Sequence, residues 1–249
     1  MKKALALVLG ISFIVMCGCK QNMPHVKEEA FVPEKVGAEI ASSVTGKVIN
    51  ENDAVLKEEF DEAKKINTIK VSFKERDEKV ILNSETGALI RYESGSITSN
   101  GKPVYTEDKT DEVLKIAEDF YKKLPVPQDY EISEWKMDFG GPDWQVDFTK
   151  KYVVDGYDKD IFNYGENVRL RISGADGSLL SAIVFYTPVE LRNTDKDAVE
   201  KEDAILLSEL DKSKITNSYI TCYKPEGKQS SRLCWCIEAD YSIEGGVCD

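Results

Sequence analysis

Four cysteines near the C-terminal end are the densest group of reactive side chains in the sequence: Cys222, Cys234, Cys236 and Cys248. On a strand, Cys234 and Cys236 point to the same face, and Cys222 lies on the preceding expected strand, within cross-strand reach. One or two disulfides are the first interpretation, half-buried free thiols the second, and a four-thiolate metal site the third. The metal interpretation ranks last because Cys-x-Cys lacks the Cys-x-x-Cys spacing that makes such sites specific.

The chain lacks the residues that the other common catalytic sites need. The only histidine is His25, so a Ser-His-Asp triad, a Cys-His pair and a three-histidine zinc site have no partner in the rest of the chain. The sequence has neither a GxGxxG nor a Walker A motif. A pair of carboxylates would suffice for glycoside hydrolysis, but none stands out among 45 acidic residues. The sequence predicts no catalytic residue, no cofactor and no metal site.

The segment from Asp155 to Glu166 has the acidic density of a calcium-binding loop. With Asp158 and Asp160 at loop positions 1 and 3, Asn163 falls where the loop requires glycine, so the segment is interpreted as a polar hairpin loop. It carries three aromatic residues that are candidates for a protein-binding surface, and aromatic packing on a sheet is the alternative. These residues are Tyr157, Phe162 and Tyr164.

The N-terminus shows a processing pattern. Lys2 and Lys3 precede a short apolar run that ends in Met-Cys-Gly-Cys, which resembles a bacterial lipoprotein signal with its lipobox. The resemblance implies a signal peptide over residues 1–18, a lipid on Cys19, and an extracytoplasmic protein anchored to the cell membrane. An uncleaved transmembrane helix is the weaker alternative, because the uncharged run from Ala4 to Gly18 would span about 22 Å of a hydrocarbon core about 30 Å thick.

Composition limits the classes of partner. The chain has 249 residues and a formal net charge of −12, with 31% charged and 41% hydrophobic residues, which is typical of a globular protein. No Lys/Arg cluster appears that would match a nucleic-acid backbone, so nucleic acid is not expected as a partner. Residues 19–52 contain prolines and charges with little periodicity, which predicts a tether.

The rest of the chain alternates between helical and extended patterns. Sparse apolar positions predict a helix over residues 53–65, and apolar positions on one face with suitable end charges predict a helix over 110–124. A third helix is expected over 198–210. Extended segments carry turn residues at their boundaries. They cover residues 69–75, 79–92, 131–139, 144–154, 167–173, 178–186, 217–224 and 232–243.

These pieces repeat. Gly87 and Gly177 are 177 − 87 = 90 residues apart, and Trp144 and Trp235 are 235 − 144 = 91 apart. We therefore expect an α+β fold of tandem units, each with one helix on a small antiparallel sheet: a first, partial unit over 53–95, a second over 110–190, and a third over 198–249. The third unit lacks the closing hairpin, so it is either a reduced unit or a truncated one with an open sheet edge.

The helix of residues 111–127, the strand around Trp144 and the closing Gly turns resemble the PepSY superfamily, particularly its YcdB/YcdC-like members. The usual Asp-x-x-Thr-Gly motif is partial here, with Asn83 before Ser-Glu-Thr-Gly87, and Asp176-Gly177 without the threonine. The resemblance implies a non-catalytic α+β module that binds proteins or restrains peptidases outside the cell. A solute-binding lipoprotein of a transporter and an envelope hydrolase with an acidic pair are the alternatives.

Overall fold

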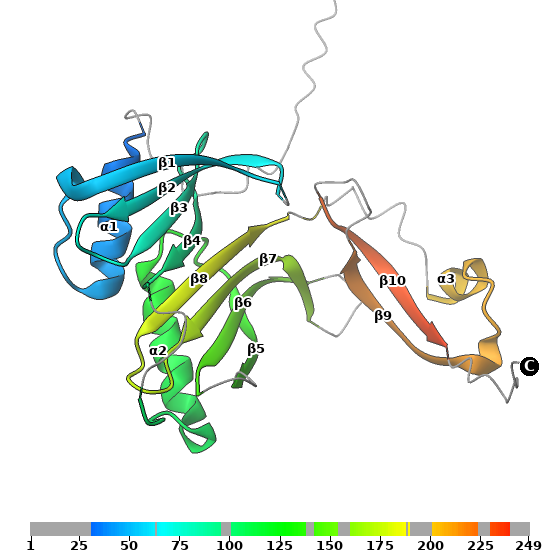
Figure 1. Cartoon of the computed structure of the whole chain (residues 1–249). Coiled ribbons are helices and arrows are strands. Elements are labelled where there is room, and N and C mark those ends of the chain that lie inside the picture. Colours follow the sequence, from blue (N-terminus) through cyan, green and yellow to red (C-terminus); the bar gives the residue numbers. More distant parts are fainter. Residues whose placement is uncertain are drawn as a thin grey trace, which may run out of the picture.

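The structure is a computed structural model. The structure describes residues 31–62, 64–95, 101–137, 142–153, 160–187, 189, 201–223 and 230–239. These residues form two antiparallel sheets, one of eight strands and one of two, with three α-helices (Figure 1). The expected α+β class is therefore confirmed. The predicted signal peptide, Cys19, Tyr157 and Cys248 lie outside the described residues.

The first helix and four strands make up module 1. Pro33 opens the helix, where its missing N–H costs nothing, and Gly37, Ala38 and Ala41 let the helix approach the sheet closely. A short 3-10 turn (Glu51–Asp53) leads into the strands. The elements are α1 (Pro33–Thr45), β1 (Ala54–Asp61), β2 (Ile66–Phe73), β3 (Lys79–Asn83) and β4 (Leu89–Glu93).

The next helix and four strands repeat this order as module 2. The helix has acids in its first turn and lysines in its last, which suits the helix dipole, and it agrees with the helix predicted over 110–124. A 3-10 turn (Glu107–Lys109) precedes it. The elements are α2 (Thr110–Lys123), β5 (Glu131–Met137), β6 (Trp144–Tyr152), β7 (Ile161–Ile172) and β8 (Leu179–Tyr186).

The two modules share one sheet. The strand order is β1-β2-β3-β4-β8-β7-β6-β5, so the last strand of each module pairs with the last strand of the other. In this antiparallel seam Arg91 lies opposite Ile183, and Tyr92 lies opposite Ala182. The expectation of separate small sheets is therefore wrong: each closing hairpin offers an open edge, and the two edges satisfy each other.

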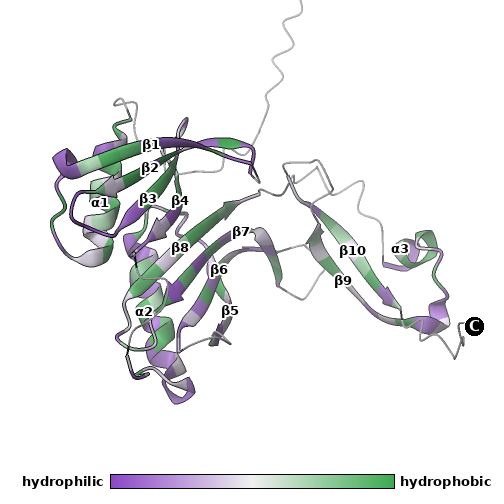
Figure 2. Cartoon of the chain, viewed as in Figure 1, coloured by the Kyte–Doolittle hydropathy of each residue, from purple (hydrophilic) through white to green (hydrophobic). Residues whose placement is uncertain are grey.

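Both helices cover the same face of the large sheet. Val113 and Ala117 of α2 and Ala38 and Ala41 of α1 belong to one buried core with the inward residues of the strands. The helices also meet each other, where the Ser43 hydroxyl donates to the Lys123 carbonyl over 3.1 Å. The strands in Figure 2 carry both hydrophobic and hydrophilic residues, as expected where one face packs on a core and the other meets water. We call that second face the helix-free face.

The closing turns of the two modules have the same geometry. Gly87 and Gly177 have φ of 70° and 74°, a conformation that glycine adopts without strain. Each glycine N–H donates over 2.9 Å to the carbonyl four residues earlier, on Asn83 and Ser173 respectively. The side-chain oxygens of Asn83 and Ser173 also accept backbone N–H groups inside their own turns. The Gly spacing in the sequence therefore reflects a repeated turn.

Two predictions for the first unit are wrong. Residues 54–61 form strand β1 and not a helix, because this segment pairs along its whole length with β2. The helix of module 1 lies at Pro33–Thr45, inside the segment interpreted as a tether, and its buried residues pack on the sheet. Its buried face combines Ile40 and Val44 with three small residues, Gly37, Ala38 and Ala41, which weaken the hydrophobic period.

The described part of the third unit is shorter than the modules. It contains α3 (Lys201–Leu207), a 3-10 turn (Lys212–Lys214), β9 (Ile215–Tyr223) and β10 (Arg232–Ala239). Strand β9 lies against β7 of module 2, beside the large sheet (Figure 1). None of the helices in the described part of the chain combines the length and the apolar character needed to cross a bilayer.

Candidate functional site

Two rows of side chains cross the seam on the helix-free face. Residues directly opposite in neighbouring strands share a face, so each row runs across the strands. The first row contains Arg91, Ile183, Arg169, Asp147 and Glu134. The second row contains Lys79, Glu93, Ser181, Arg171, Gln145 and Lys136.

Most of these side chains line a groove of about 460 Å³, which we call the seam groove. Module 1 supplies one wall and module 2 the other, so the groove exists only because the modules pair. The groove is basic: five of its lining residues are Lys or Arg and one is acidic, whereas the whole chain has 33 basic and 45 acidic residues. The charged lining residues are Lys79, Arg91, Lys136, Arg169, Arg171 and Glu93.

Buried carboxylates hold the two arginines of β7. Arg169 Nε and Nη2 donate to Asp147 over 3.0 and 2.8 Å, in a two-pronged pairing that raises the pKa of Arg169. Arg171 pairs with Asp143 over 3.3 Å. Both aspartates are fully buried, whereas the Arg169 side chain is 41% exposed. The acids therefore lie beneath the groove and fix the guanidinium groups that line it.

The turn between β1 and β2 reaches the end of β8 beside the groove. Lys64 Nζ donates to the Val184 carbonyl over 3.4 Å and lies 5.5 Å from the centre of the Phe185 ring. Burial lowers the pKa of Lys64, and the nearby positive charge of Arg91 contributes in the same direction. The Arg169 guanidinium lies 6.0 Å from the same ring. Cations from both modules thus meet around Phe185.

The predicted aromatic loop is partly a strand. Phe162 and Tyr164 lie on β7, where Phe162 is half-buried and Tyr164 is 60% exposed, so the loop boundary in the sequence interpretation is wrong. The register with β6 shifts at this point, which breaks the alternation that predicts a strand.

A buried polar cluster fixes this end of β7. Glu166, which is 1% exposed, accepts hydrogen bonds from the Tyr152 hydroxyl and, over 2.9 Å, from the Asn163 side chain. Asn163 also donates to the Thr187 carbonyl over 2.9 Å. These contacts satisfy the buried carboxylate and hold strands β6, β7 and β8 together. The cluster therefore fixes the part of β7 on which Tyr164 lies.

The described cysteines do not pair as the sequence suggested. Cys222 lies opposite Leu233, and Cys234 lies opposite Thr221. Because side chains alternate between faces, Cys222 and Cys234 project from opposite faces of the small sheet. Cys222, Cys234 and Cys236 are free, so a disulfide among these three is not formed. Burial, with a smaller effect of Glu166, raises the pKa of Cys222 to about 12. A bridge to Cys248 stays a prediction.

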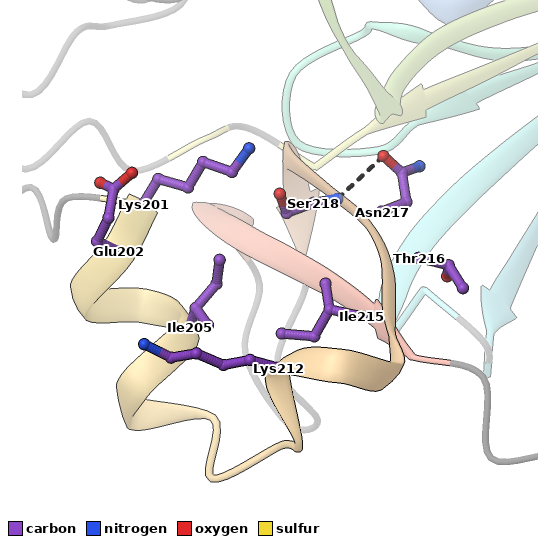
Figure 3. A pocket seen from close by; sticks show the side chains of 8 residues that line it. All are labelled: Lys201, Glu202, Ile205, Lys212, Ile215, Thr216, Asn217 and Ser218. Carbon is purple, nitrogen blue, oxygen red and sulfur yellow. Dashed lines mark hydrogen bonds between the residues drawn. The ribbon is translucent and has the colours of Figure 1, made fainter.

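A second hollow, of about 490 Å³, lies between α3 and β9 (Figure 3). Ile205 and Ile215 project into it, and Lys201, Glu202 and Lys212 stand around it. Here a seven-residue helix faces a two-stranded sheet, and α3 has no fully buried residue. Among the described residues, the hollow is bordered by few elements, and its charged lining residues are Lys201, Glu202 and Lys212.

Within the described ranges, no three His, Cys, Asp or Glu side chains gather as a metal-binding group. His25 lies outside those ranges. The acids nearest the seam groove are engaged with arginines or lysines, as the Asp147–Arg169 and Glu134–Lys136 pairs show. This arrangement can bind anionic groups through fixed donors.

Comparison with known proteins gives one structural similarity. No family model matches the sequence, and no curated protein matches it. The fold is similar to that of the YpeB C-terminal domain of Bacillus megaterium, with a TM-score of 0.47 and 12% sequence identity. The match covers 85% of this chain and 89% of that domain.

Sequence reasoning missed the seam groove. Its signal was present in residues 168–172, where Val, Leu and Ile alternate with Arg169 and Arg171. Such alternation places two arginines on the face away from the core. What no local pattern could show is which strand would lie beside them and bring Arg91 and Lys79 to the same groove.

Proposed function

We propose that this protein is a non-catalytic binding module at the outer face of the cell membrane, which binds or restrains a peptidase or another envelope protein. The observation that carries this proposal is the seam groove. It is a basic surface built jointly by two modules, and buried acids fix its arginines. An open surface of fixed donors suits recognition of another molecule better than it suits bond breaking.

Membrane anchoring through Cys19 complements this role. Each acyl chain contributes about 0.8 kcal/mol of membrane affinity for every buried CH₂ group, so a lipidated Cys19 would keep the modules at the membrane surface. Confinement raises the effective concentration of any membrane-bound partner, and a modest interface is then sufficient.

The anchoring is tested with radiolabelled palmitate in cells that express the full chain. Label is expected in the wild type and in Cys17→Ala, and it is expected to be lost in Cys19→Ala, because only Cys19 follows the small glycine of the lipobox-like pattern. Membrane fractionation of the same strains provides the second readout. Equal labelling of Cys19→Ala and wild type would remove the lipid anchor from the proposal.

The binding role is tested with the chain from residue 20 to 249 and secreted peptidases of the same organism. Binding or inhibition is expected, with no turnover of peptidoglycan or glycan substrates by the purified chain. Tyr164→Ala is expected to weaken binding about tenfold if β7 contributes to the interface, because exposed aromatic side chains are frequent anchors. Phe162 lies two residues away on the same strand, so Phe162→Ala is expected to weaken binding as well, and the exposed Phe60→Ala serves as the comparison on another part of the surface.

The same assay separates the alternatives. Turnover of a substrate would replace this proposal with the envelope hydrolase. Binding of sugars or amino acids would favour the solute-binding lipoprotein, although that class needs two lobes of alternating strands and helices, and the eight-stranded sheet here is antiparallel throughout.

A further inference from the structure

We propose that the seam groove binds an extended, acidic segment of a partner polypeptide, laid across the strands. The inference rests on the proposed function in taking the partner to be a protein, and it adds the chemistry of the segment that is recognised. Its basis is the arrangement of charge in the two rows of side chains, their spacing, and the way in which the arginines are held.

Charge identifies the ligand as anionic. The chain as a whole carries a net charge of −12, so it repels acidic partners at long range. In the seam groove the balance is reversed, with five basic lining residues and one acidic residue, Glu93, which pairs with Arg91 over 3.2 Å. An acidic segment would therefore find its favourable contacts in this groove. The local positive charge thus selects where on the protein an acidic segment binds, even where the net attraction between the two molecules is weak.

Spacing gives the length and pattern of the segment. Neighbouring strands lie about 4.8 Å apart, so the six strands from β3 to β5 span about 24 Å, equal to about seven residues of extended chain. Arg91 on β4 and Arg169 on β7 are separated by one strand, which corresponds to about 10 Å or three residues. The same interval separates β7 from Lys136 on β5. In an extended chain of polyproline II geometry, with three residues per turn and a rise of about 3.1 Å per residue, every third side chain points the same way, so acidic residues at every third position match the cations.

The held arginines favour recognition of carboxylates. Asp147 engages Nε and Nη2 of Arg169, which leaves the two Nη1 donors of the planar guanidinium for a ligand. Because the buried acid already fixes this side chain, binding costs little further side-chain entropy. Ile183 lies between Arg91 and Arg169 in the same row and offers an apolar contact to a residue between two acids.

A dense polyanion fits this groove less well. Asp143 and Asp147 partly neutralise the arginines above them, and Glu134 lies 3.2 Å from Lys136. The groove therefore offers separate donors and not an unbalanced block of positive charge. Carboxylates that are spaced along a peptide can each meet one donor, whereas the closely spaced charges of a polyphosphate would also meet the acids.

The test uses a fluorescein-labelled peptide, Ser-Glu-Ala-Leu-Glu-Ala-Leu-Glu-Ser, and the chain from residue 20 to 249 in a fluorescence anisotropy titration. Binding is expected with a Kd of about 10–100 μM at low salt, and it should weaken about tenfold when NaCl rises to 0.3 M, because salt screens exposed charges. The same peptide with glutamine in place of each glutamate is expected not to bind.

Charge variants assign binding to the groove. The double variant Lys79→Gln/Lys136→Gln is expected to raise the Kd at least about tenfold. Neither lysine is the partner of a buried carboxylate. Arg169→Gln, in contrast, would leave the buried Asp147 without its positive partner and would destabilise the fold. The matched control is Lys57→Gln/Lys115→Gln, which removes the same charge from exposed lysines outside the groove and should leave the Kd unchanged. Circular dichroism confirms that both variants fold.

Four results would count against the inference. It is overturned if the acidic peptide does not bind, if the glutamine peptide binds equally, if both double variants behave alike, or if inorganic polyphosphate binds more tightly than the peptide. None of these results affects the proposed function by itself, because that role is measured with whole peptidases. Conversely, peptidase binding that survives Lys79→Gln/Lys136→Gln would move the interface elsewhere and leave the binding module in place.

Discussion

Gly174→Ala is expected to lower the free energy of unfolding by about 3 kcal/mol or more, through overpacking. A Cβ at position 174 would lie 1.6 Å from the Pro142 carbonyl oxygen and 2.6 Å from its carbon. These are backbone atoms, so no side-chain rotation relieves the clash. The Gly174 carbonyl also accepts the N–H groups of Val104 and Tyr105, each over 2.8 Å, which limits any shift of the turn.

The measurement is urea unfolding of the chain from residue 20 to 249, followed by tryptophan fluorescence. Gly46→Ala is the control, because Gly46 has φ of 67° but no atom within 4 Å of a new Cβ. It should cost about 1 kcal/mol through backbone strain alone. Equal unfolding midpoints for the two variants would show that the approach of residues 142 and 174 is not a tight contact.

Ala182→Asp is expected to destabilise the sheet by about 4 kcal/mol or more, because a buried polar group without a partner is among the costliest substitutions. Ala182 is fully buried on the core face of β8, opposite Tyr92 across the seam. The new carboxylate would therefore disturb both modules at once. A single loss of structure in both modules is expected, and not the loss of module 2 alone.

Ser181→Asp is the matched control. It places the same carboxylate one residue away on the same strand, facing the seam groove opposite Arg171, and should change the unfolding free energy by about 1 kcal/mol or less. Hydrogen exchange reports the modules separately, through amides of β2 and β6. If β2 keeps its protection in Ala182→Asp while β6 loses it, the seam does not couple the modules and the prediction fails.

The sequence by itself determined the elements whose residues interact locally. Helix α2 follows from apolar positions one turn apart and from charges that suit its ends, all within 14 residues. The hairpins at Gly87 and Gly177 follow from the preference of glycine for the positive φ of these turns. The 90-residue interval between the two glycines indicated that the modules repeat. The basic face of β7 was also encoded locally, in the alternation around Arg169.

Only the tertiary structure decided the features that depend on distant partners. Residues 54–61 form a strand because they pair with the free edge of β2. Residues 33–45 form a packed helix because the small side chains on its buried face let it lie close to the sheet. The pairing of β4 with β8 joins positions 90 residues apart, and no local pattern specifies it. The seam groove exists through that pairing alone, since each wall belongs to a different module and the strand register sets which cations meet.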